Sequence, residues 1–158
     1  MQKKYSLLNY KSLDSTNKKI KRLIKMKKKS GNFCVSSITQ TNGYGRRNTI
    51  WHSYNGNVHL SIFLRPDCLI KQVNQLSFLT SISINQTLKQ FKNRNKIQYK
   101  WPNDMLLNER KFAGILLETS LNSNKKINWV IIGVGVNLKK YPQLKKEMFK
   151  ATSLHKEN

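Results

Sequence analysis

The sequence has few acidic residues, few prolines and almost no cysteine. Only 7 Asp and Glu stand against 30 Lys and Arg in 158 residues, with 3 prolines and 2 cysteines. Cys34 and Cys68 form neither a CxxC pair nor a disulfide framework, which argues against a disulfide-rich secreted scaffold. No run approaches the ~20 apolar residues that a membrane helix needs, and the N-terminus leads into no apolar signal segment. We therefore expect a cytoplasmic protein with one domain, which suits a chain of this length.

Common catalytic and metal-binding motifs are missing as well. The sequence has no GxxxxGK[ST] phosphate loop, no HExxH zinc motif and no nucleophile elbow. His52, His59 and His155 have no carboxylate or thiol neighbours at ligand spacing. We therefore expect no transition-metal site.

The net charge of +23 is weaker evidence for a nucleic-acid partner than it first suggests. Lysine supplies 24 of the 30 basic residues, arginine only 6, and asparagine is abundant at 18. Lys, Asn and Ile are encoded by A/T-rich codons, so genomic base composition alone can raise the charge. Phosphate-binding proteins tend instead to favour Arg, whose planar fork makes two hydrogen bonds at once.

Three helices are expected. Residues 14–17 supply helix-capping side chains, and eight of the twelve residues in 18–29 are basic, with Ile20, Leu23 and Ile24 at helical spacing. We expect residues 30–32 to end this helix. A third, shorter helix is expected over 143–149. The main helix is expected over 73–94, with an apolar stripe against a sheet formed by Val73, Leu76, Leu79, Ile82, Leu88 and Phe91.

The remaining apolar segments predict strands. Residues 58–64 alternate apolar and polar side chains, as a half-buried strand does. The fold class expected is α+β, with a mixed or mostly antiparallel sheet flanked by helices. The strands expected are 33–38, 58–64, 97–101, 112–117 and 129–136.

Two polar segments in the first third of the chain stand out. Ser15-Thr16-Asn17, taken alone, is typical of a helix N-cap. Residues 40–51 read QTNGYGRRNTIW. Their glycines let backbone N–H groups approach an anion, their arginines add charge, and the Trp can stack on a flat ring. The alternative is a flexible surface loop, in which Ile50 is the only aliphatic anchor.

Two further segments lie later in the chain. Residues 100–104 read KWPND and are followed by RKFAGILLE at 110–118. Lys100 is either a phosphate contact or a solvated charge. Residues 132–137 read IGVGVN, whose glycines taken alone indicate close packing.

The order and spacing of these four segments resemble the biotin–protein ligase family. The family pattern has an STN segment, a GRGRRG-type loop ending in Trp, a KWPND turn, an RKxAGIL strand and a GxGxN strand. Residues 51–66 and 151–154 resemble further family blocks. The resemblance implies the class II aminoacyl-tRNA synthetase-like catalytic domain of biotin and lipoate ligases. It also implies an ATP-dependent enzyme that makes biotinyl-5′-AMP and transfers biotin to a carrier lysine.

The resemblance assigns roles to individual residues. Lys111 and Arg46 would offset the charge of the biotin carboxylate and the α-phosphate. Asp104 would orient the acceptor amine or accept its proton, or it only caps its turn. Mg²⁺ would be held mainly by phosphate oxygens, with no protein metal site. The residues assigned to biotin are Ser15, Thr16, Asn17, Gln40, Gly43, Tyr44, Gly45, Arg46, Lys111 and Gly114. Those assigned to ATP are Arg46, Arg47, Trp51, Lys111 and Asn137.

The sequence departs from the family pattern in two places. Tyr44 stands where the family loop usually carries Arg, and Asn48-Thr49 replaces a more Gly/Arg-like stretch. We expect position 44 to contribute mainly its main chain. The implied domain spans 1–158, a catalytic domain that looks truncated at its C-terminus and has no room for a DNA-binding domain.

The implied partner is the biotin carrier domain of acetyl-CoA carboxylase or a related biotin enzyme. No specific nucleic acid and no membrane are expected, and a homodimer is left open. The alternatives are a lipoate-type acyl-protein ligase of the same fold, a basic nucleic-acid-binding module that uses residues 18–29, and a truncated ligase that turns over poorly.

Overall fold

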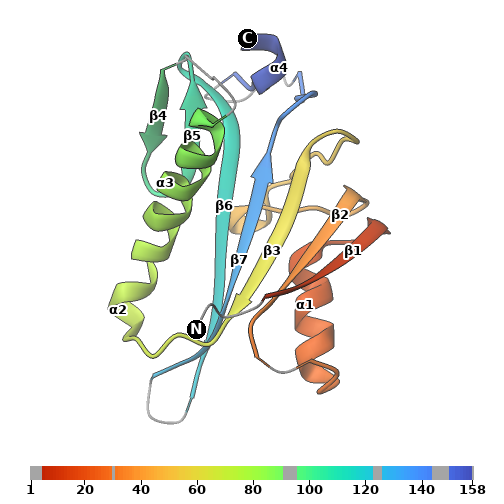
Figure 1. Ribbon diagram of the computed structural model, residues 1–158, viewed down its shortest axis with the longest axis vertical. Coiled ribbons are helices and arrows are strands. Elements are labelled where there is room, and N and C mark those ends of the chain that lie inside the picture. The colour runs from red at the N-terminus through yellow and green to blue at the C-terminus, as the bar shows by residue number, and fades with distance from the viewer. Residues whose placement is uncertain (1–4, 30, 91–95, 123–125, 144–149, 158) are drawn as a thin grey trace.

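Seven strands form one twisted sheet in the computed structural model, which describes residues 5–29, 31–90, 96–122, 126–143 and 150–157 (Figure 1). The strand order is β1-β2-β3-β7-β6-β5-β4. β1 and β2 run parallel, and every other neighbouring pair is antiparallel, which confirms a mixed α+β sheet. The strands are β1 (Ser6–Leu13), β2 (Phe33–Gln40), β3 (Val58–Leu64), β4 (Ile97–Lys100), β5 (Asp104–Leu107), β6 (Arg110–Leu121) and β7 (Ile127–Val136).

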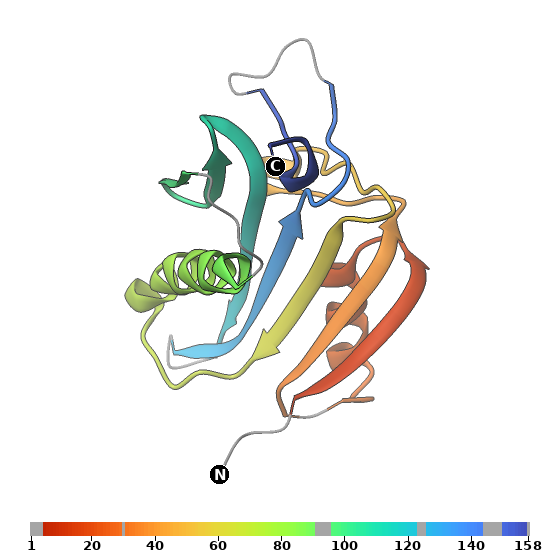
Figure 2. The same cartoon turned by 45° about the horizontal axis from the view of Figure 1, so that its top comes forward.

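Helices cover both faces of this sheet. Helix α3 (Gln75–Lys89) packs in front of β6, whereas α1 (Thr16–Lys25) lies behind β2 and β3 (Figures 1 and 2). The alternation along β7 explains this, because Ile132 packs in the core on the α3 side and Ile131 in the core on the α1 side. The short elements are α2 (Ile70–Val73), α4 (Leu154–Glu157) and a 3₁₀ turn, η1 (Arg46–Asn48).

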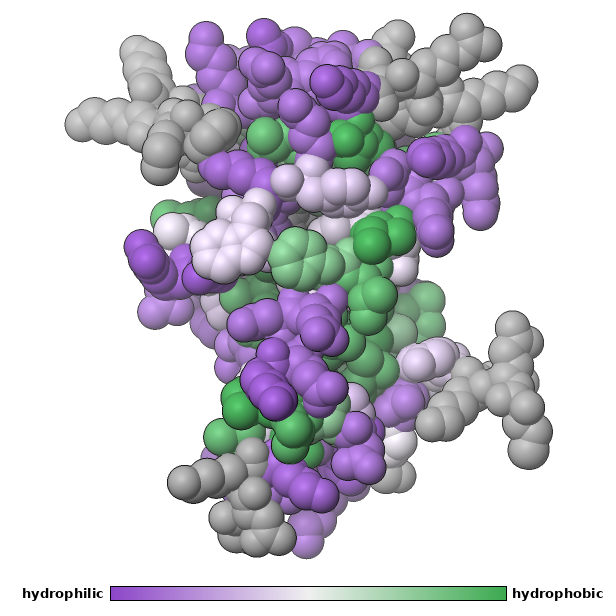
Figure 3. Space-filling view, turned by 90° about the vertical axis from the view of Figure 1, so that its left-hand side faces the viewer, coloured by the Kyte–Doolittle hydropathy of each residue, from purple (hydrophilic) through white to green (hydrophobic). Residues whose placement is uncertain are grey.

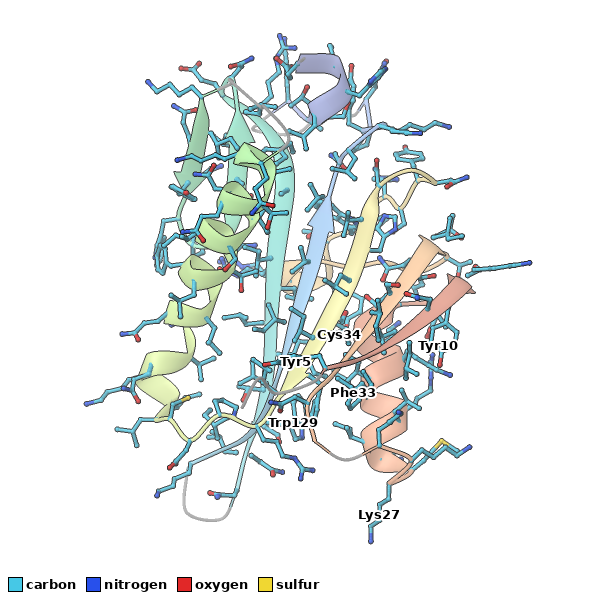
Figure 4. All side chains as sticks on the ribbon, viewed as in Figure 1. Tyr5, Tyr10, Lys27, Phe33, Cys34 and Trp129 are labelled. Atoms are coloured by element: carbon cyan, nitrogen blue, oxygen red, sulfur yellow. The ribbon has the colours of Figure 1, made fainter. Side chains whose placement is uncertain are left out.

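Helix α1 starts at the predicted cap but ends early. The Ser15 side chain accepts a hydrogen bond from the Lys18 backbone N–H, as an N-cap should. Ile20 is fully buried against the sheet, in a core whose members Tyr10, Phe33 and Trp129 are labelled in Figure 4. The expected end at residues 30–32 was wrong. Lys27 adopts a left-handed backbone with φ of 52° and stops the helix sooner.

An ion pair beside this cap predicts a pH dependence of stability. Arg22 donates to both carboxylate oxygens of Asp14 at 2.8 and 2.6 Å, which lowers the pKa of Asp14 from 3.8 to about 2. A depressed folded-state pKa adds stability that is complete above pH ~4 and is lost as pH falls through about 2. The pair is half exposed, so its contribution should not exceed about 1 kcal/mol.

Asp14→Asn should therefore lower the thermal midpoint at pH 6, with a difference from the parent that shrinks steadily as pH falls from about 4 to about 2. Melting curves of both proteins from pH 6 to 2 measure this. A constant difference over the whole range would mean that the ion pair does not contribute through the charge of Asp14.

The main helix follows its prediction only in part, because Val73, Leu76 and Leu88 of the expected stripe pack in the core but Leu79 and Ile82 do not. Asn74 separates α2 from α3, and the helix side toward the sheet carries Ser77, Ser81, Ile84 and Leu88. Leu79 and Ile82, expected in the buried stripe, are 58% and 44% exposed. Figure 3 looks onto this side, where hydrophobic residues gather midway between hydrophilic ends.

Two strands were absent from the prediction. β1 is an edge strand whose apolar residues Leu7 and Leu8 are adjacent, and β5 has only four residues, three of them buried in a row, so neither shows a clear period-2 alternation. The expected helix over 143–149 and residue 91 of the predicted stripe fall outside the described residues, except for residue 143. No helix in the described ranges is long and apolar enough to span a membrane.

Candidate active site

A cleft of about 540 Å³ opens on the α1 face of the sheet. Its volume is in the range of small-molecule sites. The N-terminus of α1, the loop after β2, the turn before β5, and strands β6 and β7 all contribute to its walls. The predicted site residues that line it are Ser15, Thr16, Asn17, Gln40, Tyr44, Gly45, Arg46, Arg47, Trp51, Asp104, Lys111, Gly114 and Asn137. Gly43 does not line the cleft. It belongs to the loop after β2 and packs against Gln40 and Ser53.

Two glycines of β7 let other side chains approach the sheet closely. A Cβ on Gly133 would lie 2.7 Å from Asn17 Oδ1, and a Cβ on Gly135 would overlap the Trp51 indole. Gly114 on β6 pairs with Gly135, so the indole lies over both. Gly133 and Gly135 were not assigned to the site from the sequence. Their spacing of two, which places both on one face of a strand, is the signal that could have found them.

A β-bulge aims Lys111 into the cleft. The β5–β6 register shifts between Met105 and Leu106, leaving Phe112 as an extra residue on β6. Phe112 and Ala113 are therefore both buried in the α3-side core, and Lys111 comes to the same side as Gly114. Lys111 Nζ lies 2.9 Å from Asp104 Oδ1 and 5.7 Å from the Trp51 ring centroid. Asp104 thus holds the ammonium group in place.

The residues assigned to biotin form a connected hydrogen-bond network. Gln40 Oε1 accepts from the backbone N–H and hydroxyl of Thr16, at 2.8 and 3.1 Å. Gln40 Nε2 donates to Ser53 Oγ at 3.0 Å. The hydroxyl of Ser61, on β3, is fully buried and contacts both Thr16 Oγ1 and Asn17 Oδ1. Ser61 is a further supporting residue that sequence reasoning missed.

Glu118 of β6 is a second missed residue, and three side chains converge on it. Its Oε2 accepts from Asn17 Nδ2 at 2.8 Å and from the Tyr44 hydroxyl at 2.9 Å. Its Oε1 accepts from Lys21 Nζ at 2.7 Å. Burial, followed by the charge of Glu118, raises the pKa of Tyr44, so the phenol stays protonated. Glu118 directly follows the apolar run of residues 112–117, and a charge at that point of a strand was the signal that could have found it.

The loop between β2 and β3 folds into a small hairpin. Tyr44 pairs with Ile50, and the Gly45 N–H donates to the Thr49 carbonyl at 2.8 Å. At its tip Arg47 and Asn48 have φ of 52° and 59°. Asn tolerates this left-handed backbone well, so it can stand in the Gly-like position. Ile50, the expected aliphatic anchor, is 75% exposed and does not hold the loop. Tyr44, which bonds Glu118, and Trp51, which packs on Gly135, anchor the loop instead.

Arg46 and Asn137 also line the cleft, outside the hydrogen-bond network of Thr16, Asn17 and Gln40. Arg46 Nη1 donates to Asn103 Oδ1 at 3.4 Å, next to the turn that precedes Asp104. The Asn137 side chain is almost fully buried, donating to the Thr152 carbonyl and accepting from Asn57. Asn137 thus also joins the end of β7 to the segment at 152.

Comparison with known proteins identifies the family. The model of the biotin/lipoate A/B protein ligase family matches residues 10–137. The chain belongs to this family. It is 34% identical over 137 residues to the bifunctional ligase/repressor BirA of Bacillus subtilis, covering 86% of this chain and 41% of that protein. It is 38% identical over 110 residues to the biotin–[acetyl-CoA-carboxylase] ligase of Paracoccus denitrificans, covering 69% of this chain and 45% of that protein.

Solved structures of family members share the fold. The biotin protein ligase of Aquifex aeolicus in complex with biotin and ATP is 27% identical, with a TM-score of 0.76 over 96% of this chain and 60% of that one. The Leishmania major ligase with biotinyl-5-AMP has a TM-score of 0.78 at 22% identity, a likeness of fold. The chain spans less than half the length of the two relatives named above.

Proposed function

We propose that this chain is a biotin–protein ligase that activates biotin with ATP and transfers it to a carrier lysine. The observation that carries the proposal is that one cleft joins two kinds of group. The Thr16–Asn17–Gln40 network offers hydrogen bonds at one wall, and Lys111 and Arg46 bring cations to the same space. Relatives named as biotin ligases, one of them crystallised with biotin and ATP, support this choice of substrates.

In the first step the biotin carboxylate attacks the α-phosphorus of ATP. A bond forms between the carboxylate oxygen and phosphorus, pyrophosphate leaves, and biotinyl-5′-AMP remains. Lys111 and Arg46 stabilise the charge that two approaching anions bring together. Trp51, whose ring lies flat over two glycines, is proposed to border the adenine with Asn137, and Arg47 to contact the phosphates. The described residues bring no three His, Cys, Asp or Glu side chains together, so Mg²⁺ would be bound mainly by phosphate oxygens.

In the second step the ε-amine of a carrier lysine attacks the acyl carbon, an amide forms, and AMP leaves. The amine must lose a proton to act as a nucleophile. Asp104 is proposed to orient it, in addition to its ion pair with Lys111. The partner proposed is the biotin carrier domain of acetyl-CoA carboxylase or a related enzyme. Because both cysteines are free thiols, we place the reaction in the cytoplasm, with residues 1–158 acting as one catalytic domain.

The test is a biotinylation assay with the protein, biotin, Mg-ATP and a purified carrier domain, read with streptavidin. We expect labelling that needs ATP and disappears when the acceptor lysine of the carrier is replaced by arginine. A parallel assay with lipoate in place of biotin tests whether the protein is instead a lipoate-type ligase. Nucleic-acid binding is measured in parallel. Affinity for nucleic acid that falls steeply between 50 and 200 mM salt, as expected for ~6–10 phosphate contacts, would instead favour a nucleic-acid-binding module. No pyrophosphate release with biotin, whether or not lipoate gives it, would overturn the proposal.

A further inference from the structure

Glu118 joins two parts of the cleft that are far apart in the sequence. One partner pair, Asn17 and Lys21, belongs to α1, and the third partner, Tyr44, belongs to the loop after β2. We call Glu118, Asn17, Lys21 and Tyr44 the Glu118 cluster. The Glu118 side chain is 21% exposed, so its bonds are shielded more than those of a surface ion pair. Hydrogen bonds to an ionised acceptor are also stronger than those between neutral groups.

The orientation of the Asn17 amide depends on this carboxylate. Asn17 Nδ2 donates to Glu118, and Asn17 Oδ1 receives the contact from Ser61. Both ends of the amide are therefore fixed, and Gly133 leaves room for it against the sheet. Without Glu118 the nitrogen would lose its partner, and a buried donor without a partner is costly.

The position of the loop depends on the same oxygen atom. Tyr44 stands at the base of the hairpin whose tip carries Arg46 and Arg47. Its hydroxyl donates to Glu118 Oε2, and Lys18 Nζ lies 5.4 Å from its ring centroid. The Tyr44 side chain, and not only its main chain, thus ties the arginine-bearing hairpin to the body of the protein.

We propose that Glu118 is a positioning residue of the biotin site, which holds Asn17 and the Arg46 hairpin in place at once through a single carboxylate oxygen. This inference rests on the proposed function and extends it to two residues, Glu118 and the Tyr44 hydroxyl. The hydrogen bonds of Glu118 favour biotin binding because they keep Asn17 and the hairpin that carries Arg46 in one arrangement. Fixing a loop before its ligand arrives reduces the ordering cost of binding.

The experiment compares Tyr44→Phe, Glu118→Ala and the double variant by biotin titration calorimetry. Each single variant should weaken biotin binding about tenfold, or about 1.4 kcal/mol. The double variant should bind about as Glu118→Ala does, because Tyr44→Phe has no bond left to remove. Glu118→Gln keeps an oxygen that can accept from Asn17 and Tyr44 but turns its amide nitrogen toward Lys21 Nζ, so its affinity should fall between those of the parent and Glu118→Ala, which a loss of packing would not explain. Tyr10→Phe removes a hydroxyl outside the cleft and serves as the matched control.

A second readout does not depend on biotin. Cleavage by an arginine-specific protease after Arg46 or Arg47, followed by mass spectrometry, should be several-fold faster in Tyr44→Phe than in Tyr10→Phe. Failure of the parent to bind biotin would refute the proposed function, while the protease result would still test the tie between Tyr44 and Glu118. If the parent binds biotin, the inference is overturned by either of two results: unchanged affinity and cleavage in Tyr44→Phe, or fully additive losses in the double variant.

Discussion

Replacing Lys111 with alanine is expected to lower the rate of biotinyl-adenylate formation by ~10²–10³, the usual cost of one preorganised charge-stabilising group. The β-bulge at Phe112 places the ammonium group in the cleft, and Asp104 holds it there at 2.9 Å. The variant removes the cation that faces the carboxylate and the α-phosphate. It also leaves the Asp104 carboxylate unpaired, which adds to the repulsion of both substrates. Pyrophosphate release with biotin and ATP measures this rate directly.

Two further variants separate charge from folding in this experiment. Lys111→Met keeps most of the side-chain volume and should lose as much activity as Lys111→Ala. Lys25→Ala removes an equal charge from the exposed end of α1 and should leave the rate within about twofold of the parent. Pyrophosphate release in Lys111→Met at the parent's rate would show that the charge has no part in activation.

Gly135→Ala is expected to weaken ATP binding by about tenfold to a hundredfold, because Trp51 is proposed to border the adenine. The new methyl group would overlap the Trp51 indole, which lies directly on the strand. The ring must then move into the cleft or the strand must shift, and overpacking of this kind costs ~1–3 kcal/mol. Titration calorimetry with ATP, and with biotin in a second series, measures the loss. A Cβ on Gly114, at 3.2 Å from the same ring, is less crowded, so Gly114→Ala should lose less.

A double variant tests the cause of that loss. In a Trp51→Ala background the ring is gone, so the added Gly135→Ala should cost little further affinity. If Gly135→Ala were equally damaging there, the glycine would be required for the strand backbone rather than for the approach of Trp51. Thermal midpoints of all four proteins show whether binding falls because the fold is lost.

The candidate site could be largely predicted from the sequence because its chemistry lies in short contiguous segments. Ser15-Thr16-Asn17 and the KWPND turn each carry several site side chains within a few positions. A local motif of this kind needs only the backbone of one turn or one helix start, and those depend on nearby residues. The strand 58–64 was likewise exact in its bounds, because one half-buried face imposes strict alternation.

Other parts could not be predicted, because they depend on contacts between distant segments. The buried side of α3 includes the polar residues Ser77 and Ser81, which no apolar periodicity reveals. Ser61 and Glu118 are polar residues of β3 and β6 whose partners lie 44 to 101 positions away. A pattern along the chain carries no information about which side chain will meet them.

The sequence by itself determined the family, the α+β class and most of the residues around the cleft, since each rests on local order and spacing. Only the tertiary structure decided how those residues act together. The bulge at Phe112 turned Lys111 toward Asp104, and the glycines of β7 admitted Asn17 and Trp51 to the sheet surface. Glu118 then gave the Tyr44 hydroxyl a hydrogen-bond acceptor, where the sequence had pointed mainly to the main chain at this position. The physical reason is that register, close approach and shared hydrogen-bond acceptors arise only when separate strands are packed together.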